Sequence, residues 1–146
     1  MIPKRLLFSG LILLVAIVGI PFGSGQSNVF DKETFTVQGY DGSSCYYYSY
    51  YTYNSTGWYI KGSVKVNSGK IDFFILNQVD YKAFGNGARR NCQSFRPSSS
   101  ELTVIGTTSY SVDYKVPDNG YHYFVYFNPF TADASVTVML TWSRSP

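Results

Sequence analysis

The stretch WYIKGSVKV, residues 58–66, alternates between two kinds of side chain. Apolar or small residues occupy the even positions, and tyrosine, lysine or serine occupies the odd ones. Because successive side chains of a strand point to opposite faces of a sheet, this pattern predicts a strand with one buried face. Asn67, Ser68 and Gly69 follow, and Gly69 can supply the positive φ of a tight turn. The stretch therefore predicts an antiparallel sheet with an inside and an outside.

Similar strand signals continue on both sides of this segment. Residues 77–84 predict one helical turn, with either Val79 and Ala83 or Tyr81 and Phe84 facing inward. The remaining strands are expected at residues 35–37, 45–53, 71–76, 102–105, 110–116, 121–128 and 135–142. About eight short strands separated by turn residues indicate an all-β fold, an antiparallel β-sandwich or jelly roll.

The first 25 residues differ from the rest. Lys4 and Arg5 precede uncharged residues 6–22, and small residues follow. This order is typical of a secretory signal, although the apolar segment approaches the ~20 residues that span a bilayer. We therefore expect a signal peptide or N-terminal membrane anchor helix at 1–25 and a β-sandwich domain at 26–146. Both alternatives place the domain outside the cytoplasm, secreted or on the surface, with membrane contact through residues 6–22 if the anchor is retained.

The charge balance indicates no nucleic-acid partner. The chain has 12 basic and 9 acidic side chains and a net charge of +3. Without Lys4 and Arg5, 10 basic and 9 acidic side chains remain, which leaves +1. A protein that binds nucleic acid depends on a much larger excess of positive charge.

Two sequence features fit an exported domain. Cys45 and Cys92 are predicted to form a disulfide, since disulfides persist outside the cytoplasm; the alternative is two buried free thiols. Asn54 begins the sequon Asn-Ser-Thr, which marks it as a candidate glycosylation site in an exposed turn.

Residues 45–53 read CYYYSYYTY and hold six tyrosines. On a strand, alternate residues share a face, so these side chains divide into two sets. One face is expected to carry Tyr46, Tyr48 and Tyr50, and the other Tyr47, Tyr51 and Tyr53 together with Cys45. Tyrosine has a large apolar ring and a polar tip, so such faces can be half buried. The six tyrosines are either a candidate contact surface or the outer layer of a thin sandwich.

Residues that usually carry catalysis are scarce. His122 is the only histidine, and it falls in a predicted strand, where a structural role is expected. With one histidine and two paired cysteines no zinc site can be assembled, and neither a metal nor a cofactor is predicted. Turns at 41–43 and 118–120 could hold calcium, but such turns contain Asp and Gly for backbone reasons. The protein is therefore not expected to be an enzyme.

Residues 110–128 and 135–142 carry a family resemblance. A turn with Gly120, an aromatic-rich strand closed by Asn128 and a final alternating strand are similar to the GOLD (Golgi dynamics) domain of exported and lumenal proteins. Residues 58–66 and 71–77 fit its preceding strands. The resemblance implies a compact jelly-roll-like sandwich used for protein or ligand contact, without catalytic residues. The coiled coil and membrane span of lumenal cargo receptors do not follow Pro146, so their role is not expected.

These observations lead to three functional hypotheses. The first is an exported non-catalytic interaction module that binds a protein or glycan through an aromatic surface. The alternative is a structural subunit of a cell-surface filament or coat, which self-associates when residues 26–38 add a strand to a neighbour's sheet edge. A small hydrolase acting on extracellular polymers is the third, and no pair of carboxylates in the sequence selects it.

Overall fold

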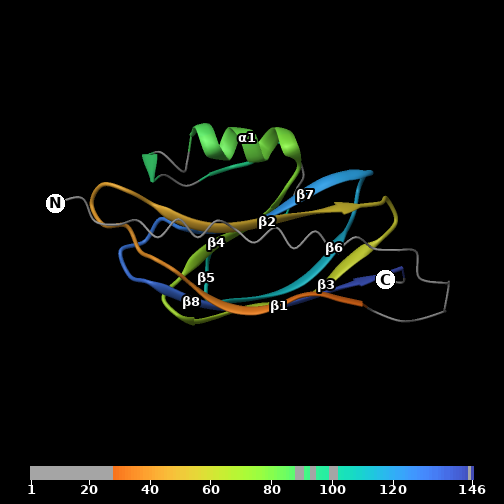
Figure 1. Cartoon of the computed structure of the whole chain (residues 1–146), viewed down its shortest axis with the longest axis horizontal. Coiled ribbons are helices and arrows are strands. Elements are labelled where there is room, and N and C mark those ends of the chain that lie inside the picture. The colour runs from red at the N-terminus through yellow and green to blue at the C-terminus, as the bar shows by residue number, and fades with distance from the viewer. Residues whose placement is uncertain (1–27, 88–90, 93–94, 99–101, 145) are drawn as a thin grey trace.

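The computed structural model describes residues 28–87, 91–92, 95–98, 102–144 and 146 (Figure 1). The predicted signal or anchor at 1–25 lies outside the described residues. Within them, eight strands form two four-stranded antiparallel sheets, which confirms the predicted all-β sandwich. The strands are β1 (Asn28–Val37), β2 (Tyr46–Asn54), β3 (Tyr59–Ser68), β4 (Ile71–Leu76), β5 (Leu102–Thr107), β6 (Ser109–Lys115), β7 (Gly120–Asn128) and β8 (Ala134–Ser143).

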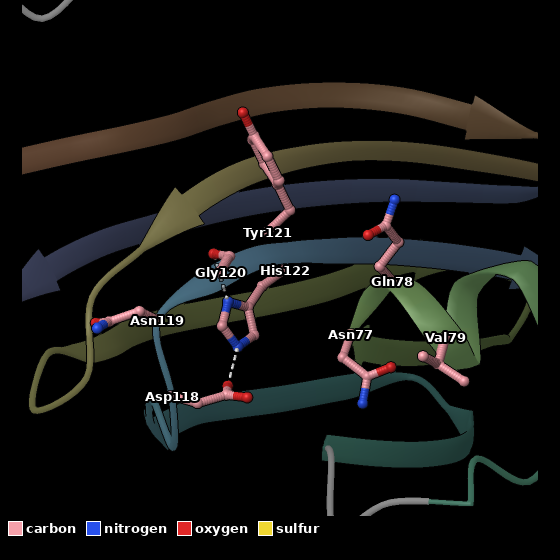
Figure 2. Close-up of a pocket in the computed structure, with 8 residues that line it drawn as sticks. All are labelled: Asn77, Gln78, Val79, Asp118, Asn119, Gly120, Tyr121 and His122. Carbon is pink, nitrogen blue, oxygen red and sulfur yellow. Dashed lines mark hydrogen bonds and ion pairs between the residues drawn. The ribbon is translucent and has the colours of Figure 1, made fainter.

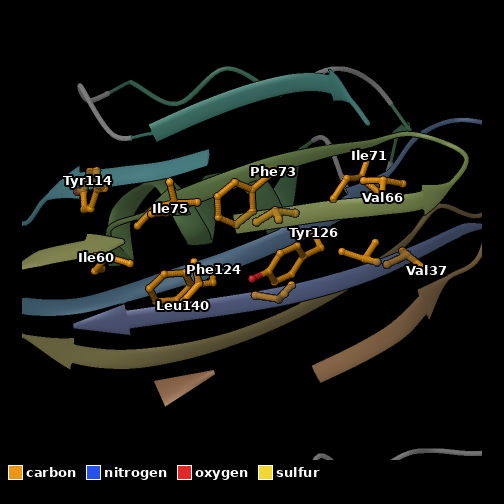
Figure 3. Packing of buried hydrophobic residues seen from close by; sticks show 14 of the residues in the cluster. Val37, Ile60, Val66, Ile71, Phe73, Ile75, Tyr114, Phe124, Tyr126 and Leu140 are labelled. Atoms are coloured by element: carbon orange, nitrogen blue, oxygen red, sulfur yellow. The ribbon is translucent and has the colours of Figure 1, made fainter. Parts of the chain in front are cut away.

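The chain alternates between the two sheets except at β4 and β5, which are neighbours in the same sheet. One sheet has the strand order β1-β8-β3-β6 and the other β2-β7-β4-β5. Their facing sides enclose the main core, in which Phe73, Phe124 and Tyr126 are fully buried (Figure 3). The strand with one buried face predicted for residues 58–66 is confirmed, because Ile60 and Val64 are buried in this core while Lys65 is exposed.

A second, smaller core lies on the outer side of the β2-β7-β4-β5 sheet. The helix α1 (Gln78–Asn86) covers this side and buries Phe84 against Phe74 and Leu76 of β4 (Figure 1). Strand β4 is therefore buried on both faces, which explains its continuous apolar sequence. Of the two predicted helix orientations, the one with Tyr81 and Phe84 inward is correct, since Val79 and Ala83 are exposed.

Two links hold α1 in place. Asn77 caps the helix, and its side-chain Oδ1 accepts a hydrogen bond of 2.9 Å from the backbone N of Asp80. After the helix, Cys92 forms the predicted disulfide with Cys45, which directly precedes β2. The bridge links two residues that are 47 positions apart in the sequence. It joins the helical layer to the sheet beneath it. No helix among the described residues has the length and apolar character needed to cross a bilayer.

Strand β1 corrects one prediction. Only residues 35–37 were expected to form a strand of the domain, and residues 26–38 were expected to be able to add a strand to a neighbour's sheet edge. In the structure β1 pairs with β8 from Asn28 opposite Trp142 to Val37 opposite Ala134. The alternation of burial along β1 was missed because two of its half-buried positions hold Asp31 and Glu33. The polarity of these side chains therefore does not indicate which face of the strand is buried.

Asn54 corrects a second prediction. Its side chain was expected in an exposed turn, but Asn54 ends β2 opposite Gly120 and is 5% exposed. Its Nδ2 donates a hydrogen bond of 2.9 Å to Oγ1 of Thr52. In the folded protein a glycan could join this nitrogen only if the side chain left its buried position.

Candidate functional site: a tyrosine surface and the hollow beside it

The tyrosines of β2 alternate between two faces, as predicted, but they do not form one contact surface. Tyr46, Tyr48 and Tyr50 pack against the main core. Tyr48 stacks on Phe35 with ring centroids 4.2 Å apart, and Tyr50 stacks on Phe124 at 4.9 Å. Burial raises the pKa of Tyr50, whose hydroxyl lies 3.2 Å from that of Tyr126, so the phenol stays protonated. These three tyrosines therefore have a structural role.

On the opposite face of β2, the three remaining tyrosines have different surroundings. Tyr47 belongs to the second core and meets the ring of Phe84 edge-on at 5.5 Å. Tyr51 and Tyr53 lie beyond α1 and are 54% and 57% exposed. Only these two members of the predicted contact surface are open to solvent to this extent.

Strand β7 supplies further tyrosines to the same face. Tyr121 lies opposite Tyr53, and Tyr123 lies opposite Tyr51. The ring of Tyr121 meets the rings of Tyr51 and Tyr53 edge-to-face at 5.6 and 5.4 Å, and Tyr123 stacks on Tyr81 of α1 at 4.1 Å. We call this group of five, Tyr51, Tyr53, Tyr81, Tyr121 and Tyr123, the tyrosine surface.

Exposed large hydrophobic side chains concentrate at and near the tyrosine surface. Among the described residues, six large hydrophobic side chains are prominently exposed. Four of them belong to this surface or border the hollow described below: Tyr51, Tyr53, Val79 and Tyr121. The other two, Ile105 and Met139, lie on β5 and on the other sheet. A concentration of exposed apolar side chains is typical of an interaction site.

A hollow of about 300 Å³ adjoins this surface (Figure 2). Its wall combines the start of α1, the turn between β6 and β7, and the first residues of β7. Tyr121 borders the hollow and belongs to the tyrosine surface, so the two adjoin at this residue, although its ring points away from His122 and Asp118 (Figure 2). The lining residues are Asn77, Gln78, Val79, Asp118, Asn119, Gly120, Tyr121 and His122.

His122 lies at the inner wall of the hollow and is 1% exposed. Its Nδ1 is 3.2 Å from the carbonyl oxygen of Gly120, which can only accept, so Nδ1 carries the proton of this bond. Its Nε2 lies 3.5 Å from Oδ1 of Asp118 and makes no hydrogen bond to any described residue (Figure 2). The ring also contacts that of Tyr114 edge-on. The structural role expected for His122 therefore explains the contacts of the ring and of Nδ1, but it gives no partner to Nε2.

The turn at 41–43, also considered for calcium, uses its carboxylate within the turn. Oδ1 of Asp41 accepts hydrogen bonds from the backbone N of Ser43 and Ser44, and the hydroxyl of Tyr46 donates to Oδ2 at 2.8 Å. These bonds, that of Tyr46 above all, lower the pKa of Asp41 well below its usual range. Among the described residues, no group of three or more His, Cys, Asp or Glu side chains is placed to hold a metal.

A scan against models of known protein families found no match for the chain, and a search of curated proteins found none either. The resemblance to the GOLD domain therefore stays a prediction. The geometry of the tyrosine surface and of the hollow is what indicates a function.

Proposed function

We propose that this protein is an exported, non-catalytic binding module that holds a glycan on the tyrosine surface. The observation that carries the proposal is the cluster of exposed rings of Tyr51, Tyr53 and Tyr121, the last of which also borders a hollow lined by amide and carboxyl groups. Small-ligand sites commonly combine aromatic walls with a few well-placed polar groups. The strand order supports a jelly roll, an architecture that lectin domains use.

The chemistry of the site suits a sugar better than a purely apolar ligand. A pyranose ring has C–H faces that pack on aromatic rings and hydroxyls that need hydrogen-bond partners. The tyrosines offer rings with polar tips. The hollow offers the side chains of Gln78, Asp118 and Asn119. Oδ1 of Asn119 accepts a bond of 2.8 Å from the backbone N of Thr56, which holds this amide in position before a ligand arrives.

The surface is also held firmly from behind. Tyr81 lies against Tyr123 from the helical side, and the hydroxyl of Tyr81 is 3.0 Å from Oγ of Ser49 on β2. The disulfide holds the segment after α1 to the same sheet. Binding residues that sit on paired strands and a packed helix lose little conformational entropy when a ligand binds.

Export is supported by the disulfide, which is stable in oxidising compartments. The filament alternative is less favoured, because strand addition by residues 26–38 would require β1 to leave its pairing with β8. A protein partner on the tyrosine surface is the remaining alternative, and it is an outcome of the following test.

The test is binding of the purified domain to a panel of soluble neutral and amino-substituted polysaccharides, by affinity electrophoresis and calorimetry. We expect one class to bind, and Tyr51→Ala, Tyr53→Ala and Tyr121→Ala each to weaken its binding by about fivefold, since an aromatic contact contributes about 1 kcal/mol. Met139→Ala is the matched control, because Met139 is 46% exposed on the opposite sheet. The proposal is wrong if no glycan binds, if the tyrosine variants match this control, or if only a protein partner requires these tyrosines.

A further inference from the structure

His122 and Asp118 lie side by side without a hydrogen bond between them. With Nδ1 of His122 donating to the carbonyl oxygen of Gly120, Nε2 is an acceptor when the ring is in its neutral form. Oδ1 of Asp118 is also an acceptor, and the two atoms are 3.5 Å apart. Nε2 is buried and has no hydrogen bond to any described residue, which is unusual for a buried polar atom. A donor that reaches both atoms would satisfy them together.

From this geometry we infer that the hollow binds the protonated amino group of an amino sugar, an inference that rests on the glycan-binding function proposed above. A primary ammonium has three N–H donors, so it can bond to the imidazole and to the carboxylate at once, at distances of about 2.8 Å. A sugar hydroxyl or an N-acetyl amide has a single hydrogen to donate. Only the ammonium also brings the positive charge that balances Asp118.

The position of Asp118 allows a ligand to enter. Its side chain is 71% exposed at the rim, so it can rotate with little loss of packing and open Nε2 to the hollow. The hollow has a volume of about 300 Å³, at the lower end of the ~300–1,000 Å³ typical of ligand sites, and one sugar ring fits that size. Tyr121 connects it to the tyrosine surface, where neighbouring sugar rings of a longer chain would lie.

General electrostatics would not produce this preference. The chain has a net charge of +3, so a cationic oligosaccharide is not attracted to the protein as a whole. Binding of an ammonium group therefore has to come from a local arrangement, and Asp118 is the only carboxylate among the residues that line the hollow.

The experiment compares a glucosamine tetramer with its fully N-acetylated counterpart by calorimetry at pH 6.5–7. We expect the glucosamine tetramer to bind at least roughly tenfold more tightly, and Asp118→Asn to abolish this preference while binding of the N-acetylated tetramer persists. Asp113→Asn is the control, because Asp113 is also 71% exposed but lies on the other sheet. Nitrogen NMR of His122 in the ligand-free protein should show a neutral ring with Nδ1 protonated.

Each other outcome has a defined meaning. The inference is overturned if the two tetramers bind equally, if Asp118→Asn behaves like Asp113→Asn, or if NMR finds His122 already protonated and paired with Asp118 at neutral pH. In those cases the proposed glycan binding survives as long as the N-acetylated tetramer binds and loses affinity in Tyr51→Ala. If neither tetramer nor any glycan of the panel binds, both proposals fail.

Discussion

Tyr81 of α1 stacks on Tyr123 of β7 with ring centroids 4.1 Å apart and an angle of 10° between the ring planes. The hydroxyl of Tyr81 also lies 3.0 Å from Oγ of Ser49 on the neighbouring strand β2. One helical side chain thus contacts both strands that carry the tyrosine surface. It links the helical layer to the proposed binding face.

The first prediction concerns this link. We expect Tyr81→Ala to reduce the free energy of unfolding by about 2 kcal/mol, since a half-buried ring loses its contacts with Tyr123. Tyr81→Phe keeps the ring and removes only the hydroxyl contact with Ser49, so it should cost about 1 kcal/mol or less. Urea denaturation measures both. Equal losses in the two variants would contradict a role for the stacked ring.

The second prediction concerns Asp72 on β4, which is 1% exposed. Its Oδ1 accepts a hydrogen bond of 2.8 Å from the backbone N of Gly106, at the irregular pairing of β4 with β5. Burial raises the pKa of Asp72 above its ordinary value of 3.8, and the Gly106 bond offsets this in part. The carboxyl group is thus more easily protonated in the folded than in the unfolded chain.

The sign of the pH effect follows from that shift. As the pH rises from 3.8 through the folded-state pKa, the wild type loses stability, because the unfolded chain ionises first. Relative to Asp72→Asn, which has no titrating group there, the wild type should therefore gain stability between pH 7 and pH 4. Asp72→Ala should cost about 1–2 kcal/mol by removing the acceptor of Gly106. Urea midpoints across this pH range test both, and a difference independent of pH would contradict the raised pKa.

The third prediction concerns the disulfide. Replacing Cys45 and Cys92 together by serine should reduce the free energy of unfolding by about 4 kcal/mol, the chain-entropy value for a loop of 47 residues. Thermal unfolding with and without reductant provides the measurement, with the double variant insensitive to reductant. An unchanged midpoint in the wild type after full reduction would show that the bridge does not hold the helical layer.

The fourth prediction concerns Asn54, whose amide donates to Oγ1 of Thr52 and is buried. Asn54→Ala should reduce the free energy of unfolding by about 1 kcal/mol through the lost hydrogen bond. Ser55→Ala, at the exposed next position, should be close to neutral. If both substitutions are neutral, Asn54 has no structural role and its sequon regains interest as a modification site.

The two sheets could be predicted from the sequence because buried apolar residues and exposed polar residues alternate along most of the strands. In β3, Ile60 and Val64 alternate with exposed Lys65, and the pattern is unambiguous. In β1 the half-buried positions hold Asp31 and Glu33, so the same rule fails where polar residues face inward. The local pattern therefore predicted the strands well, and for β1, where burial and polarity disagree, it predicted only the last three residues, 35–37.

The candidate site was only partly predictable, because it depends on long-range pairing. The run at 45–53 drew attention to Tyr51 and Tyr53, and alternation along the predicted strand 121–128 places Tyr121 and Tyr123 together on one of its faces. Only the pairing of β2 with β7 joins the two pairs. The hollow forms where the start of α1 lies near the β6–β7 turn. No local sequence pattern around Asp118 indicates that these two segments are close in space.

The most direct test of the central claim is an NMR titration that follows the tyrosine rings as a glycan is added. With ring-labelled tyrosine and the tightest-binding oligosaccharide of the panel, we predict that the signals of Tyr51, Tyr53 and Tyr121 shift in proportion to occupancy. The signals of the buried Tyr50 and Tyr126 should stay in place. Shifts confined to residues of the opposite sheet, such as Tyr59, with the tyrosine surface unchanged, would contradict the account.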